Sequence, residues 1–147
     1  MRLSEMVGRR LRAARRRGRV VSVGVVYRPD VDRFSKQSTL PVPIATGEEI
    51  YRAALALLAG RDVRRLVGTL GVGLAGLSDD DGQLDLFAGP TRPRSERLEV
   101  AMDAIRDRFG EDAVQRARLL GRAPVVRDRI AFGNTGHPED KKDGAEA

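Results

Sequence analysis

Side chains that could carry chemistry are few in this sequence, and they are scattered. The single histidine, His137, lies in a polar C-terminal stretch, and the absence of cysteine excludes thiol catalysis and thiolate metal sites. Three aspartates at residues 79–81 precede Gly82, which is typical of a turn and lacks the imposed geometry of a Ca²⁺ site. Asp103 and Asp107 lie one helical turn apart beside arginines, as in surface charge pairing. We therefore expect no catalytic residue and no metal ligand in this chain.

A short peptide at residues 83–87 has more specific chemistry. It reads Gln-Leu-Asp-Leu-Phe and stands between the aspartate turn and a Gly-Pro loop. An extended peptide of this type places its last two apolar side chains in a pocket while the glutamine amide hydrogen-bonds at the edge. The residues expected to make these contacts are Gln83, Leu84, Leu86 and Phe87. The alternative is an edge strand with both leucines inward, but the flanking turn and loop favour a docking peptide.

Charge is unevenly distributed along the chain. The net charge is +6, from 27 Lys and Arg against 21 Asp and Glu. Residues 1–78 hold 15 basic and 6 acidic side chains, whereas residues 79–147 hold 12 and 15. A basic half attracts polyanions such as nucleic-acid phosphates, although solubility alone explains the asymmetry equally well. No run approaches the ~20 apolar residues of a membrane span and no apolar signal segment is present, so a cytoplasmic location is expected.

A hairpin over residues 19–40 is the element around which the others must be arranged. One side of its first half is apolar and consists of Val21, Val23, Val25 and Tyr27. The residues between them are mostly small or basic. Pro29 and the aspartates beside it suit the turn between the two strands. Such a hairpin can bury one face and leave the other to a ligand.

Two helices are expected to cover the apolar side of the hairpin. The first spans residues 4–17, with Ser4 as its N-cap, Gly18 as its end and an arginine-rich face toward solvent. The second is indicated more strongly, because Thr46 and Glu49 have the spacing of a capping box. Its apolar stripe is Ile50, Ala54, Leu57 and Leu58.

A third strand and further helices complete the expected elements. A Leu-Pro-Val-Pro break at residues 40–43 ends the hairpin, and residues 64–77 later alternate between larger apolar and mostly small side chains. Ser95 is expected to cap a helix that ends at Gly110, followed by a short second helix over residues 112–120. One side of the longer helix carries Leu98, Ala101, Met102, Ile105 and Phe109.

In this order the segments resemble the little-finger (C-terminal) domain of a Y-family translesion DNA polymerase of the DNA polymerase IV group. The pattern Gln-Leu-any-Leu-Phe matches the peptide by which bacterial replication and repair proteins dock on the sliding clamp. Residues 94–120 are similar to an extension that follows this peptide in some members. The other segments that carry the resemblance are residues 20–27, 35–41, 48–55 and 65–68 with the strand that follows.

The resemblance implies an α+β fold with an antiparallel sheet and two helices on one face, then a linker and a helical C-terminal extension. The implied parts are a DNA-binding domain at 1–78, a linker with the clamp peptide at 79–93, the extension at 94–121 and a disordered tail at 122–147. The family's first strand, which precedes the first helix, has no counterpart here. An exposed sheet edge is therefore expected.

The resemblance also implies that the sheet lies across duplex DNA and contacts phosphates without reading sequence. The residues implied to bind DNA are Ser22, Arg28, Arg33, Lys36, Ser38, Thr39 and Arg65. The palm, fingers and thumb of a polymerase are absent from the sequence. No cofactor is expected in this chain, because Mg²⁺ would belong to the absent palm.

The expected function is a non-catalytic DNA-binding and clamp-docking module of a translesion polymerase, encoded by a truncated or split gene. Its expected partners are duplex DNA, the sliding clamp and a polymerase subunit that carries the palm, with no membrane partner. A further possibility is a subunit that completes a polymerase in trans. The alternative is a small basic RNA- or ribosome-associated α/β protein in which residues 83–87 are only a strand.

Overall fold

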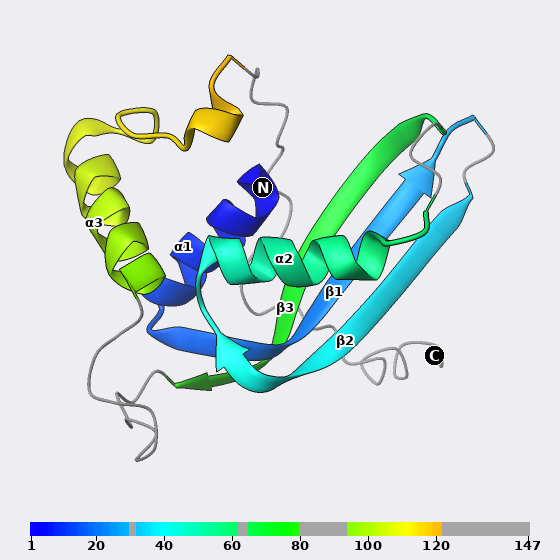
Figure 1. Cartoon of the computed structure of the whole chain (residues 1–147), viewed down its shortest axis with the longest axis horizontal. Helices are drawn as coiled ribbons and strands as arrows, with labels where there is room; N and C mark the ends of the chain where they lie inside the picture. Colours follow the sequence, from blue (N-terminus) through cyan, green and yellow to red (C-terminus); the bar gives the residue numbers. More distant parts are fainter. Residues whose placement is uncertain (30–31, 62–64, 80–93, 122–147) are drawn as a thin grey trace, which may run out of the picture.

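The computed structural model describes residues 1–29, 32–61, 65–79 and 94–121. A three-stranded sheet carries two helices on one face, and a third helix stands beside the first (Figure 1). The α+β class and the antiparallel sheet expected from the sequence are therefore confirmed. In chain order the elements are α1 (Arg2–Ala13), β1 (Arg16–Tyr27), β2 (Arg33–Ile44), α2 (Gly47–Leu58), β3 (Val67–Asp79), α3 (Arg94–Phe109) and the short 3₁₀ helix η1 (Ala117–Leu119).

Strand β1 is the central strand, in the order β2-β1-β3 with antiparallel pairing on both sides. Buried and more exposed residues alternate along β1 as expected, because every second residue from Val21 to Tyr27 is buried under the helices. The side chains of α2 that meet this face include Ile50, which is 0% exposed, with Ala54 and Leu57 buried and Leu58 packed against them. The predicted capping box is also confirmed, because Glu49 N donates to Thr46 Oγ1 and Thr46 N donates to Glu49 Oε2.

Some predicted boundaries are wrong for identifiable reasons. Ser4 is a buried residue within α1 rather than its N-cap. The helix ends at Ala13, ahead of the predicted Gly18, and the chain turns at Arg15, whose φ is 52°. Likewise α3 already includes Ser95, and the short helix expected over residues 112–120 is reduced to η1. Residue types that are typical of helix caps therefore did not predict these boundaries.

The prolines at residues 40–43 do not end the hairpin, contrary to the sequence interpretation. Strand β2 runs through Pro41 and Pro43 to Ile44. It is an edge strand of the described sheet, and an edge strand can tolerate proline because its outer side needs no ladder donor. The other edge belongs to β3, where Leu70 and Leu77 are exposed. No strand within the described residues pairs with that edge.

The two sheet-covering helices touch backbone to backbone at Gly8 and Gly47. A Cβ at Gly8 would lie 2.7 Å from Gly47 N, and a Cβ at Gly47 would lie 2.8 Å from Glu5 Cα. Neither position has room for a side chain, so both glycines are required by close approach. This contact brings α1 directly to the N-terminus of α2.

Replacing Ile50 with Ala should lower the free energy of unfolding by about 2–5 kcal/mol, because the site is fully enclosed and the cavity cannot collapse completely. Chemical denaturation monitored by circular dichroism measures this change. The control is Val42→Ala on β2, where the side chain is exposed and the expected loss is below about 0.5 kcal/mol. Equal losses at the two positions would contradict the packing described above.

Candidate nucleic-acid interface

The face of the sheet opposite α1 and α2 is uncovered by any described helix. Residues directly opposite one another in an antiparallel pair share a face, so the register identifies the side chains on it. Strand β1 contributes Val20, Ser22, Gly24 and Val26. Strand β2 contributes Arg33, Ser35, Gln37 and Thr39, and β3 contributes Thr69, Gly71, Gly73 and Ala75. We call these twelve residues the outer face.

The outer face has a single charged side chain, Arg33 at one end, and four hydroxyl groups, those of Ser22, Ser35, Thr39 and Thr69. Gly24 pairs with Gly71, and a Cβ at Gly24 would meet no atom within 4 Å. The backbone of the central strand is therefore accessible there. Hydroxyl groups and exposed backbone suit a surface that contacts phosphates without distinguishing bases.

The strand register places the residues predicted to contact DNA on different faces of the sheet. Ser22, Arg33 and Thr39 lie together on the outer face. Lys36 and Ser38 pair with Val23 and Val21 and so lie on the helix side of the edge strand. The prediction therefore combined residues of opposite faces on one strand.

Arg28 and Arg65 lie near the hairpin end of the sheet but in different settings. The Arg28 side chain lies over Gly68, just past the end of β1. The Arg65 guanidinium stacks over the Tyr27 ring at 4.3 Å on the helix side and donates to Asp32 Oδ2 at 2.7 Å. This hydrogen bond lowers the pKa of the Asp32 carboxyl below its usual value. Arg65 is thus engaged away from the outer face.

Three polar residues of the outer face were missed by the sequence prediction, namely Ser35, Gln37 and Thr69. The signal that could have found two of them was the alternation of β2 itself, because they share parity with Arg33 and Thr39. The residues predicted to bind the clamp, Gln83, Leu84, Leu86 and Phe87, lie outside the described residues, as do the tail and part of the aspartate turn. Within the described ranges there is no metal-binding cluster, and no helix is long and apolar enough to cross a membrane.

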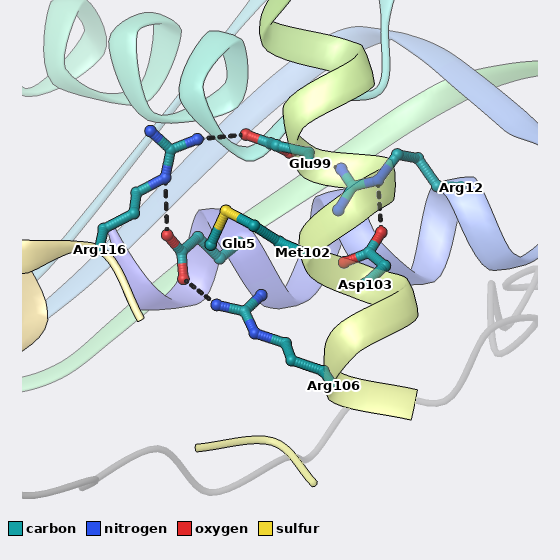
Figure 2. A pocket seen from close by; sticks show the side chains of 7 residues that line it. All are labelled: Glu5, Arg12, Glu99, Met102, Asp103, Arg106 and Arg116. Atoms are coloured by element: carbon teal, nitrogen blue, oxygen red, sulfur yellow. Dashed lines mark hydrogen bonds and ion pairs between the residues drawn. The ribbon is translucent and has the colours of Figure 1, made fainter. Parts of the chain in front are cut away.

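A cluster of charged residues, separate from the outer face, joins α1 to α3. From the sequence the arginines of α1 were expected to form a solvated face. Arg12 Nη1 lies 2.6 Å from Glu99 Oε2, and Arg12 Nε lies 2.7 Å from Asp103 Oδ2. Figure 2 shows these groups converging between the two helices. Arg9 on the same face of α1 pairs with Asp107 and Glu111. The basic face of α1 is therefore largely covered by acidic residues from α3 and the turn after it.

Glu99 also caps the N-terminus of α2 from another helix. Its Oε2 accepts from Gly47 N at 2.7 Å, and its Oε1 accepts from Glu48 N at 3.2 Å. Arg116 Nη2 donates to the same carboxylate at 2.7 Å. Free N–H groups and the positive end of the helix dipole favour an anion at this position. Glu99 is 4% exposed and is satisfied on all sides by donors.

This charged cluster is closed. Glu5 pairs with both Arg106 and Arg116, and Met102 fills the space beside them (Figure 2). The space between these side chains is too small for a water molecule. The cluster therefore holds α3 in place and has no room for a ligand.

Comparison with known protein families gives a match that covers the sheet and the two helices packed on it. The model of the impB/mucB/samB family C-terminal domain matches residues 1–86, which include all of the sheet and both helices that cover it. The chain belongs to this family. It carries a little-finger domain of the Y-family DNA polymerases, as the resemblance implied.

The chain is similar over most of its length to proteins named DNA polymerase IV. One from Pelotomaculum thermopropionicum is 40% identical over 129 residues, which cover 86% of this chain and 31% of the relative. DNA polymerase IV 2 of Bacillus subtilis is 38% identical over 137 residues, covering 88% of this chain and 32% of the relative. A Bacillus subtilis protein named "Putative UV-damage repair protein UvrX" is 32% identical over 118 residues, which cover 78% of this chain and 28% of the relative.

These matches extend well past the family domain. A stretch covering 86% of the chain cannot fit within residues 1–86, so the relatives also share sequence with the part that contains α3. The chain spans about 30% of the length of the first of these relatives. The little-finger domain and its extension thus correspond to a part of those proteins.

Replacing Glu99 with Ala should lower the free energy of unfolding by about 3 kcal/mol, because two helix N–H groups would be left without their acceptor and Arg12 and Arg116 would each lose a carboxylate partner. Hydrogen exchange in α3 should accelerate as well. The control is Asp107→Ala, which removes an exposed pair with Arg9 and should cost at most about 1 kcal/mol. Unchanged stability and exchange in Glu99→Ala would contradict the role given to this carboxylate.

Proposed function

We propose that this chain is a non-catalytic DNA-binding and clamp-docking module of a translesion polymerase that acts in DNA repair in the cytoplasm. The outer face would hold the duplex backbone, and residues 83–87 would tether the chain to the sliding clamp. Nucleotide transfer would require a palm, supplied by another part of a longer chain or by a partner polypeptide. The observation that carries the DNA-binding proposal is an uncovered sheet face in a domain of a DNA polymerase family.

The outer face suits a nucleic-acid backbone because no described helix covers it and its polar groups are spread along neighbouring strands. Arg33 supplies a positive charge near one end, while Ser22, Ser35 and Thr39 supply hydroxyl groups. Hydroxyls and main-chain amides donate to phosphate oxygens without selecting a base sequence. This matches an activity that must proceed on many templates. Affinity from so few charges should be modest and should fall as salt rises.

A tether to the clamp would compensate for modest DNA affinity. Linking two contacts makes the second one intramolecular, at an effective concentration in the millimolar range for a short linker. Residues 80–82 alone separate the peptide from the end of β3. A clamp encircling DNA would therefore keep the outer face close to the duplex.

Adjacent residues on β2 provide a test of which face binds DNA. Thr39 lies on the outer face and Ser38 on the helix side. Thr39→Glu should weaken binding to a primed duplex about fivefold to tenfold at low salt, because a carboxylate close to a phosphate costs about 1 kcal/mol. Ser38→Glu adds the same charge one residue away and should change affinity less than twofold. Fluorescence anisotropy measures both, and equal losses or a larger loss for Ser38→Glu would refute the assignment of the face.

The clamp peptide is tested by Leu86→Ala combined with Phe87→Ala. Loss of both apolar anchors should weaken clamp binding at least tenfold, while duplex binding without the clamp stays unchanged. Surface plasmon resonance with immobilised clamp measures the first quantity. Comparison of duplex DNA with structured RNA separates this proposal from a ribosome-associated protein. Clamp affinity that survives the double substitution would exclude the docking role.

A further inference from the structure

Helix α3 exposes its apolar side. Leu98 is 52% exposed and Phe109 is 67% exposed, and Ile105 between them is also exposed. With Ala101 they recur at intervals of three and four residues, so they form one stripe along the helix. We call these four residues the α3 stripe. Met102, at the border of the stripe, is the one large apolar residue of α3 that is buried.

Charged residues on the side of α3 opposite the stripe fix the orientation of the helix. Glu96, Glu99 and Arg106 are the polar residues of α3 that are buried, and each has an oppositely charged partner. Figure 2 shows Glu99, Asp103 and Arg106 directed at α1 and at Arg116. Rotating the helix to bury the stripe would separate these pairs, leaving Arg12 without either carboxylate and Glu5 with Arg116 alone. The fold therefore holds the stripe outward.

The chain length between α3 and the clamp peptide limits what can reach the stripe. Seven peptide units connect Phe87 to Arg94, the first residue of α3. A fully extended chain of this length spans at most about 25 Å. Whatever protein holds Phe87 must therefore come within about 25 Å of the N-terminus of α3, close enough to reach the helix. At the resulting millimolar effective concentration, even a weak apolar contact adds to the affinity.

We propose that the α3 stripe is a second contact surface for the protein that takes up residues 83–87. This inference rests on the proposed function, in which that protein is the sliding clamp. On the clamp, the area that the α3 stripe contacts would be an apolar depression with acidic groups at its rim. The reason is that Arg94, Arg97 and Arg108 flank the stripe and are exposed. Leu98 and Phe109 are about 16 Å apart along the helix, which sets the length of the contact.

The test measures clamp affinity of the full chain carrying Ile105→Ala and Phe109→Ala together. Alanine keeps the helix and leaves the charged side of α3 intact, so circular dichroism should not change. We expect clamp binding to weaken about tenfold, because two half-exposed apolar side chains no longer become buried. The matched control is Val42→Ala with Leu55→Ala, which removes two exposed apolar side chains elsewhere on the domain. Its clamp affinity should stay within twofold of the unaltered chain.

The outcomes separate this inference from the proposed function. If Leu86→Ala with Phe87→Ala abolishes binding but the Ile105 and Phe109 pair has no effect, the stripe is not a contact and only the present inference fails. If the Leu86 and Phe87 pair itself has no effect, the clamp-docking proposal fails and the inference falls with it. Equal weakening in the stripe variant and its control also overturns the inference.

Discussion

The apolar side chains of β1 all lie on one face of the sheet, and the remaining structure depends on this asymmetry. Because one face must be covered, α1 and α2 both pack on it. Two helices sharing so small a surface approach closely, and Gly8 and Gly47 allow their backbones to touch. That contact places the basic face of α1 next to the N-terminus of α2. The opposite face carries hydroxyl groups and glycines and is covered by no described helix.

The N-terminus of α2 and Arg12 together create a strong anion site that the chain fills itself. Glu99 accepts from two backbone amides and two guanidinium groups, so a carboxylate that is almost fully buried remains satisfied. A buried charge without such partners would be costly. The consequence is that α3 docks through its polar side, the reverse of the usual arrangement for a helix on a globular domain.

The little-finger domain therefore presents two surfaces of different chemistry. The sheet offers hydroxyls, a small number of charges and accessible backbone, which is suited to phosphates. The extension offers an apolar stripe with arginines beside it, which is suited to a protein. The charged cluster between α1 and α3 connects the two and fixes their relative placement.

Local patterns in the sequence determined the elements and the buried side of β1, because alternation in a strand and a capping box such as Thr46 with Glu49 depend on neighbouring residues. The same alternation in β2 separates Thr39 from Ser38. Proline in β2 was misjudged because only the tertiary structure reveals that β2 is an edge. The apolar periodicity of α3 was predicted correctly. Which side of the helix faces the domain was decided by Arg12 and Gly47, which lie far away in the sequence. No local pattern contains that information, since it arises only when α1 and α2 meet.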